Sequence, residues 1–313
     1  MSQTQVAEAP GDGDAFAAQA LASDLEELSA HLVGFLAAVS PSDWARPTDR
    51  HPGAWTLREA LAHVVAFADG LLRSLEGALA GDPYAWPDLT SREDLPAVNA
   101  RDIADRSHLG AKELVGNLTD TLDRTVGIAA RLNPRQLKLS VKVAAYNRSL
   151  VVAELLGFQL VHPGIVHAAQ LANGFGVKPL WVRYPPELMH RQLTRLFSIA
   201  SHSYWPERGG DRVASINLIV GGPAGGRWFL SMNPDGGSSG EGRAEHQALT
   251  VRAANAAALC RAFTFQVSPL RAALTGQMLA WGDLRLLLRM PHLFAPTSED
   301  LVLAADRGHG PSD

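Results

Sequence analysis

The sequence predicts an α+β protein in which a four-helix bundle is followed by an α+β domain with a mainly antiparallel sheet. Before residue 180, apolar residues recur every three or four positions in four segments, which is typical of amphipathic helices. After residue 187, one helical segment leads into short runs separated by glycine-rich turns, which is typical of strands. Because 313 residues are too many for one ordinary core, we expect two domains, at residues 14–178 and 187–300.

The first two helices are predicted from their leucine spacing and from a capping sequence. The first covers Phe16 to about Val39. The second begins after Thr56, because Glu59 follows three residues later, which is the spacing of a capping box. His63 lies at the edge of the apolar stripe of this second helix. We therefore expect His63 to lean towards the interior of the bundle.

The third and fourth helices complete the predicted bundle. The third covers roughly Asp102 to Arg131, and a short strand or loop is expected at Leu137 to Val143. The fourth is capped by Asn147 or Ser149 and ends at Asn173-Gly174. Sites in such bundles are built from inward side chains on facing helices.

The fourth helix contains a strongly apolar stretch, residues 155–172, with two histidines, two glutamines and a proline. At 100° per residue, Pro163 and Gln170 lie within about 60° of His167, so this histidine faces the neighbouring helices. A buried imidazole needs partners. His167 is therefore either a metal ligand or a hydrogen-bonded core histidine.

The second half of the chain is predicted to contain a helix, strands and further short helices. The alternation in the first strand indicates a sheet packed on one face. The helices are expected at Glu187 to about Ser203, Ala253–Thr264 and Leu270–Leu274, and the strands at Val213–Val220, Trp228–Met232 and Ala248–Arg252.

Composition restricts the class of protein. With 46% apolar residues, 19% charged residues and a net charge of −4, we expect no nucleic-acid partner. The single cysteine, Cys260, excludes an internal disulfide and a CxxC motif, and we interpret it as a small buried hydrophobe and not as a nucleophile. The sequence lacks a run of 18 apolar residues and a basic signal-peptide region, so we expect a cytoplasmic protein without a membrane partner, as a monomer or homodimer.

Two motifs in the predicted bundle carry a family resemblance. The second helix begins with Trp55-Thr56-Leu57-Arg58-Glu59-Ala60-Leu61-Ala62-His63, and the fourth ends with Val166-His167-Ala168-Ala169-Gln170-Leu171-Ala172. They resemble the start of helix two and the end of helix four of the DinB-like metalloenzyme bundle. In that superfamily, one helix-two histidine and an acidic-or-His-x-x-x-His pair on helix four hold a divalent metal. The resemblance implies catalytic and metal-binding roles for His63 and His167, with zinc or nickel as the metal.

The middle ligand of that pattern is missing, because Pro163 stands four residues before His167. His162 is five residues before His167 and about 140° round an ideal helix. Pro163 removes a backbone donor, and together with Gly164 it could allow a bulge at residues 159–164 that turns His162 towards the site. We therefore take His162 as the candidate third ligand and Gln170 as a supporting or substrate contact.

The end of the chain resembles a second family. The run Leu274 to Asp283, with the leucines that follow it, is similar to the closing motif of the SCP2-like α+β domain. A DinB-like bundle followed by an SCP2-like domain is the architecture of the mycothiol-dependent maleylpyruvate isomerase family, and the resemblance covers about residues 16–297. It implies mycothiol as the cofactor thiol. The candidate arginines for substrate binding are Arg191, Arg195, Arg208, Arg212 and above all Arg227.

We therefore expect a mycothiol-dependent enzyme that acts on an electrophilic small metabolite, for instance in natural-product biosynthesis. Of the two enzyme classes that the sequence allows, we expect an S-transferase rather than a thiol-assisted isomerase. The thiolate would be formed either by a metal or by His63 or His167 acting as a general base. The alternative is a non-enzymatic carrier that holds a lipid or hydrophobic metabolite in the SCP2-like domain, under the apolar segment that contains Leu287.

Overall fold

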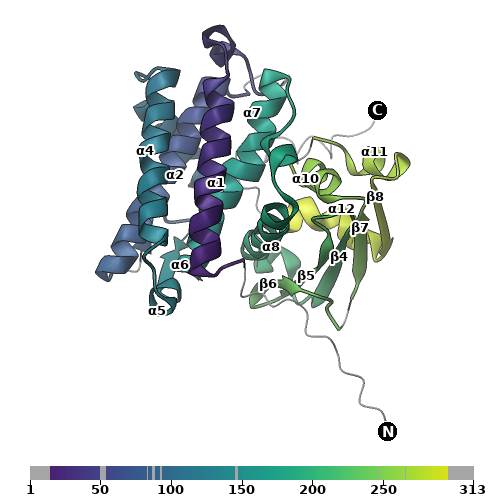
Figure 1. The fold of residues 1–313 in the computed structure, drawn as a ribbon. Coiled ribbons are helices and arrows are strands. Elements are labelled where there is room, and N and C mark those ends of the chain that lie inside the picture. Colours follow the sequence, from purple (N-terminus) through teal and green to yellow (C-terminus); the bar gives the residue numbers. More distant parts are fainter. Residues whose placement is uncertain are drawn as a thin grey trace.

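The computed structural model describes residues 15–49, 54–82, 84–86, 89–91, 94–144, 147–245, 247–264 and 266–294. The expected α+β class is confirmed, with a helical bundle first and a mainly antiparallel sheet second (Figure 1). The end of the predicted second domain, at residue 300, lies outside the described residues. The four long members of the bundle are α1 (Ala18–Ala37), α2 (Leu57–Ala80), α4 (Ala111–Ala129), and a fourth helix formed by α6 (Val152–Val161), the π-helical turn η3 (His162–His167) and α7 (Ala168–Phe175).

The capping box predicted for α2 is present. The Glu59 backbone N–H donates to the Thr56 hydroxyl oxygen over 3.2 Å, and the Thr56 backbone N–H donates to the Glu59 carboxylate over 2.7 Å. At the other end, Gly81 adopts a left-handed conformation with φ +95°, which ends the helix. These contacts fix the start of α2 two turns before His63.

The predicted third helix is wrong as a single element. The chain forms α3 (Leu95–Asp105) and then α4, which begins after Gly110. Arg58 of α2 donates hydrogen bonds to the carbonyl oxygens of Arg106, Ser107 and Leu109 in the intervening turn. The break is therefore held by a side chain from another helix, which periodicity along the chain does not reveal.

The predicted cap of the fourth helix is also wrong. Ser149 lies in strand β3 (Arg148–Val151), and Val151 precedes the first helical residue. Strand β3 pairs antiparallel with β2 (Ser140–Val143). Strand β2 lies within Leu137 to Val143, where a strand or loop was expected. Strand β1 (Tyr84–Ala85) pairs with β2 and completes a small sheet. The short helix α5 (Pro134–Leu137) precedes β2.

The second sheet has the strand order β6-β5-β4-β7-β8, in which only the β4–β7 pair is parallel. The three predicted strands are confirmed, while the glycine- and serine-rich β6 and the glycine-ended β8 were not expected as strands. The prediction that the first strand packs on one face only is wrong, because Ser215 and Asn217 on its other face are also buried. The Ser215 hydroxyl forms a hydrogen bond with the Ser231 hydroxyl, and the Asn217 side chain forms hydrogen bonds with the Gln247 side chain and the Ala244 backbone N–H. The strands are β4 (Ala214–Val220), β5 (Gly226–Asn233), β6 (Gly236–Glu241), β7 (Leu249–Ala253) and β8 (Met278–Gly282).

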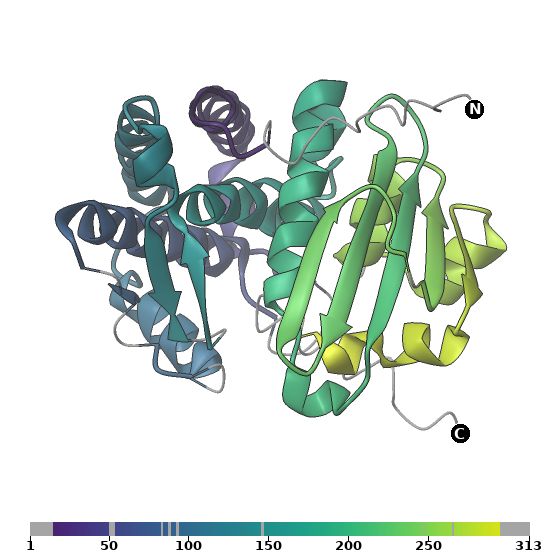
Figure 2. The same ribbon diagram turned by 90° about the horizontal axis from the view of Figure 1, so that it is seen from below.

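Helix α8 (Pro186–His202) lies between the bundle and the second sheet, as Figure 2 shows. On its bundle side, Arg191 and Arg195 form ion pairs of 2.6 and 2.7 Å with the fully buried Asp24 of α1. On its sheet side, Thr194 accepts a hydrogen bond from the indole of Trp228 over 3.0 Å. The same helix therefore fixes both halves of the molecule to each other.

The remaining elements are short and surround the second sheet or the ends of the bundle. None of the helices in the described ranges has an 18-residue stretch apolar enough to cross a membrane. These remaining short elements are η1 (Pro41–Ala45), η4 (Leu180–Arg183), α9 (Pro206–Gly209), α10 (Ala256–Phe263), α11 (Pro269–Leu274) and α12 (Leu284–Leu293).

Candidate metal centre

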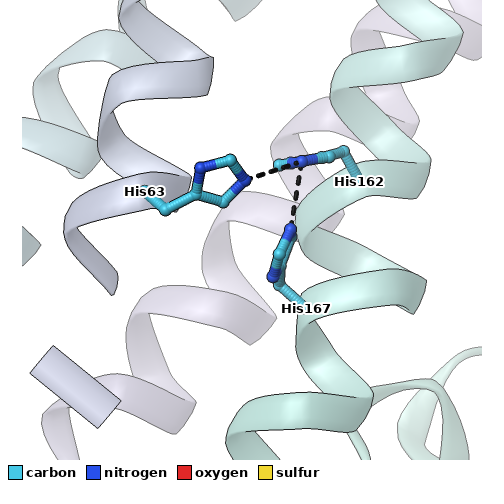
Figure 3. A group of neighbouring side chains, drawn as sticks. All are labelled: His63, His162 and His167. Carbon is cyan, nitrogen blue, oxygen red and sulfur yellow. Dashed lines mark hydrogen bonds between the residues drawn. The ribbon is translucent and has the colours of Figure 1, made fainter. Parts of the chain in front are cut away.

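Three histidines converge inside the bundle. The Nε2 atom of His162 lies 3.3 Å from Nε2 of His63 and 3.0 Å from Nε2 of His167 (Figure 3). One ring nitrogen from each residue lies within 4.8 Å of the others. The three residues are only 0–5% exposed. Helix α2 supplies His63, and the two ends of η3 supply the other two.

The π-helical turn explains why His162 reaches the site. In a regular helix, residues five apart point about 140° away from each other, whereas the i→i+5 hydrogen bonding of a π-helix brings them to the same face. Pro163 has no backbone N–H and cannot make the regular helical hydrogen bond. The bulge expected at residues 159–164 is present at His162–His167, so His162 takes the place that an i, i+4 ligand would have.

Two side chains from outside the fourth helix support this turn. The Tyr184 hydroxyl donates to the Gly164 carbonyl over 3.0 Å, and the Gln192 amide donates to the Leu160 carbonyl over 3.1 Å. A Cβ at position 164 would lie 2.8 Å from a methyl of Leu28 and 3.0 Å from the Tyr184 oxygen. Position 164 therefore needs glycine because α1 and Tyr184 approach the backbone closely.

The contacts among the rings suit a cation better than a hydrogen-bond chain. An imidazole nitrogen carries either one proton or one lone pair, so Nε2 of His162 cannot bond well to both neighbours at once. Three lone pairs around one cation have no such conflict. Two ligand bonds of about 2.1 Å at a tetrahedral angle separate the nitrogens by about 3.4 Å. The two separations to Nε2 of His162, 3.3 and 3.0 Å, are close to this value, and the three nitrogens all lie within 4.8 Å of one another. The residues therefore fit a three-histidine metal site with an open fourth position.

The surroundings keep the imidazoles neutral. Burial, reinforced by the neighbouring imidazoles, holds the pKa values of His63 and His162 well below 6.5, and burial lowers the pKa of His167 to about 4. The Phe67 ring stacks on His162 at 3.6 Å between centroids, and Trp55 lies 5.0 Å from His63. Neutral imidazole is the form that binds metals, so the site is ready to ligate at neutral pH.

Gln170 orients His167. The side-chain oxygen of Gln170 lies 2.7 Å from Nδ1 of His167. Because a carbonyl oxygen only accepts, this contact assigns the proton to Nδ1 and leaves the lone pair on Nε2, which faces the other histidines. The half-buried Gln170 thus lies beside the cluster.

The candidate arginines lie elsewhere. Arg227 is exposed on β5, and its neighbour Trp228 faces α8, so the side chain of Arg227 projects from the opposite face of the sheet. The structure does not bring Arg227 together with the histidines. The other four have contacts of their own: Arg191 and Arg195 with Asp24, Arg208 over the Trp205 ring at 3.7 Å, and Arg212 with Asp283 at 3.0 Å.

Cys260 is fully buried in α10, and burial raises the pKa of its thiol to about 12. It therefore remains protonated at neutral pH and is a small core residue, as its apolar neighbours in the sequence predicted.

Residues that support the cluster were harder to predict. Phe67, Tyr184 and Gln192 contact the histidines or the π-helical turn, but each belongs to an ordinary amphipathic pattern or a linker. The local signals were the Pro163-Gly164 pair, which indicated a bulge without indicating its partners, and the spacing of four residues that puts Phe67 on the same helix face as His63.

Comparison with known proteins gives the following matches. Residues 25–172 match the family model described as the mycothiol maleylpyruvate isomerase N-terminal domain. A search of curated proteins found no match. Among solved structures, a histidine-to-alanine variant of the mycothiol-dependent maleylpyruvate isomerase is 17% identical with a TM-score of 0.51, over 78% of this chain and 87% of that one.

Two further solved structures match with lower TM-scores. The mycothiol-dependent maleylpyruvate isomerase itself is 16% identical with a TM-score of 0.49, over the same shares of the two chains. An uncharacterised protein from Escherichia coli UTI89 is 14% identical with a TM-score of 0.41, over 50% of this chain and 88% of that one. At these identities, the variant structure supports a shared fold across most of the chain and nothing finer.

Proposed function

We propose that this chain, whose residues 25–172 belong to the mycothiol maleylpyruvate isomerase N-terminal domain family, is a mycothiol-dependent enzyme with a divalent metal held by His63, His162 and His167. The observation that carries the proposal is the convergence of three buried ring nitrogens from α2 and the π-helical turn. Three protein ligands leave one position for a thiol or water, as in catalytic zinc sites.

The low pKa values favour a ligand role over the general-base alternative. An ordinary thiol has a pKa of about 8.5, while the pKa of His167 is about 4, so this imidazole is a poor acceptor for the thiol proton. A zinc or nickel ion bound here would instead supply the positive charge that deprotonates a coordinated thiol outright. The histidines contribute by holding their lone pairs in one place, with His167 oriented by Gln170.

For the reaction, we propose thiol-assisted cis–trans isomerisation of an activated alkene, an α,β-unsaturated acid such as maleylpyruvate. The thiolate sulfur adds to one carbon of the double bond, and the electron pair moves onto the conjugated carbonyl. The carbon–carbon bond, now single, rotates. The electron pair then re-forms the double bond, the carbon–sulfur bond breaks and the thiolate leaves unchanged.

Thiol transfer, which the sequence led us to prefer, needs the same thiolate but ends with sulfur bonded to the substrate. The comparisons give more support to isomerisation, because they name isomerases. Transfer in natural-product biosynthesis is therefore the second candidate for this site. Analysis of the product distinguishes the two reactions, because only transfer consumes mycothiol.

The surroundings suggest how a substrate reaches the cluster. Trp55 and Phe67 line the α2 side with aromatic carbon, which would exclude water from a bound thiolate. Gln170 is half-buried beside His167, and Gln266 from the second half of the chain donates to the Ala169 carbonyl over 2.9 Å. We propose that the substrate approaches on this side, where both halves of the chain meet.

The test combines metal analysis with turnover of maleylpyruvate in the presence and absence of mycothiol. His63→Ala and His167→Ala should each lower turnover about 100-fold or more while the fold stays intact. His108→Ala is the matched control, because His108 is exposed on the turn between α3 and α4. A wild-type protein that contains no metal and shows no mycothiol-dependent conversion would refute the proposal.

One surface feature favours the carrier alternative. Leu270, Leu274, Trp281, Leu284 and Leu288 are between 47% and 80% exposed on α11, β8 and α12. Exposed apolar side chains of this kind can contribute to lipid binding. The test is binding of a fluorescent fatty acid to the wild type and to Leu287→Asp, which places a charge on α12 next to Leu288 in the sequence. Tight binding that the substitution abolishes, without any thiol-dependent turnover, would favour the carrier.

A further inference from the structure

Gln159 has a fully buried side chain that makes no hydrogen bond with the described residues. It is 0% exposed, and in the described part of the chain neither its amide nitrogen nor its amide oxygen has a hydrogen-bond partner. The Nδ1 atom of His162 is likewise buried without a partner there. Buried polar atoms in folded proteins almost always have partners, and each exception calls for an explanation such as a role that appears when a ligand or ion binds.

These unpartnered groups are neighbours on one face of the same helix. Gln159 is in α6, three residues before His162, which begins the π-helical turn. Residues at this spacing lie side by side on a helix surface. Side chains of a helix also lean towards its N-terminus, so the His162 ring leans over the turn that carries Gln159. The rings of Phe67 and Phe158, at 3.6 and 6.1 Å from the His162 ring, have no acceptor to offer Nδ1.

The second histidine of this helix already has the corresponding contact. The oxygen of Gln170, three residues after His167, lies 2.7 Å from Nδ1 of that ring. Histidines that bind a metal usually donate the other ring N–H to such an acceptor, which orients the ring and raises its basicity. In this sequence each of the two histidines has a glutamine three residues away, on opposite sides of the π-helical turn.

We propose that Gln159 is a positioning residue for His162. When His162 binds a cation through Nε2, its proton is on Nδ1, and the Gln159 amide oxygen turns to accept it, as Gln170 does for His167. This inference depends on the proposed metal site. In the metal-free protein Gln159 destabilises the fold, because its amide is buried without partners, and in the metal-bound protein it increases affinity.

The experiment measures zinc affinity and metal-free stability of Gln159→Met, which keeps the length of the side chain and removes the amide. Affinity is measured by competition with a chromogenic chelator, and stability by thermal unfolding after chelation. We expect zinc affinity to fall about 10- to 100-fold while the metal-free protein unfolds at the same or a higher temperature, because an apolar group replaces an unpaired amide.

The matched control is Leu156→Met, a fully buried position on the same helix that is three residues further from the histidines. It should leave zinc affinity unchanged. A Gln159→Met protein with wild-type zinc affinity would overturn the inference, and so would a parallel loss of stability without zinc, which would indicate a merely structural role. If the wild type itself binds no zinc, the proposed metal site fails, and this inference fails with it.

A wild-type measurement covers the case in which the variant does not fold. In the zinc-loaded protein with 15N-labelled histidine, the Nδ1 proton of His162 should exchange slowly with solvent because Gln159 accepts it. Loss of the metal should abolish that protection. Rapid exchange of this proton in the zinc-loaded protein would overturn the inference.

Discussion

His162 and His167 are five residues apart on one helix, yet their Nε2 atoms lie 3.0 Å from each other. A regular helix would direct the two rings to different faces, and a π-helical turn that contains Pro163 directs them to the same point. The chain thus builds a ligand pair with a spacing that the usual i, i+4 pattern does not include.

The first prediction concerns Pro163. Pro163→Ala restores a backbone N–H, so the fourth helix can adopt regular hydrogen bonding and His162 turns away from the site. We expect the metal-free protein to become equally or more stable and zinc affinity to fall at least 10-fold. Zinc affinity is measured by chelator competition. Unchanged affinity in this variant would mean that the π-helical turn does not depend on the proline.

The second prediction concerns Tyr184, whose hydroxyl donates to the Gly164 carbonyl within the turn. Tyr184→Phe should destabilise the protein by about 1 kcal/mol, the usual contribution of one hydrogen bond, and should weaken zinc binding several-fold. Denaturant unfolding and zinc competition measure the two effects. Tyr84→Phe is the control, because Tyr84 is 55% exposed and should change neither quantity.

The third prediction concerns pH. The pKa of His167 is about 4 in the folded chain and about 6.5 when unfolded, so between these values the unfolded chain binds more protons. The stabilising contribution is therefore complete above pH 6.5 and is lost as the pH falls towards 4. For His167 alone the loss is about 3 kcal/mol. Urea unfolding of the metal-free protein at pH 7, 6 and 5 tests this, and equal stability at all three would contradict it.

The fourth prediction concerns Asp24, the buried partner of Arg191 and Arg195 on α8. Asp24→Asn removes the buried carboxylate that both guanidinium groups contact, which should cost about 3–5 kcal/mol of stability. Thermal unfolding compared with that of Asp43→Asn provides the measurement, because Asp43 is in an exposed ion pair with Arg46. Similar unfolding temperatures for the two variants would show that α8 does not depend on this contact.

Some parts of the molecule could be predicted because their cause is local. The spacing of Thr56 and Glu59 predicts a capping box, and this capping box marks the start of α2 as expected. The recurrence of leucine every three or four residues predicted the helices of the bundle. The same recurrence predicted that His63 and His167 face the interior. The bulge near Pro163 was predictable because proline cannot donate the regular hydrogen bond.

Other parts depend on contacts between distant segments. The break after α3 is held by Arg58 from α2, and the strand β6, with its glycines and serines, is stabilised by pairing with β5. Arg227 was a reasonable anion ligand from its charge alone, but its side of β5 is fixed by the packing of Trp228 on α8. The direction of the His162 side chain could be predicted only by knowing that the turn has π-helical hydrogen bonding, and the sequence alone does not show this.

The most direct test of the central claim is a zinc titration of the metal-free wild type and of His162→Ala, followed by chelator competition. If His63, His162 and His167 form one site, the wild type should bind one zinc ion per chain, and the variant should bind it at least 100-fold more weakly while its circular dichroism is unchanged. Equal affinity in the two proteins, or no zinc binding by the wild type, would contradict the account.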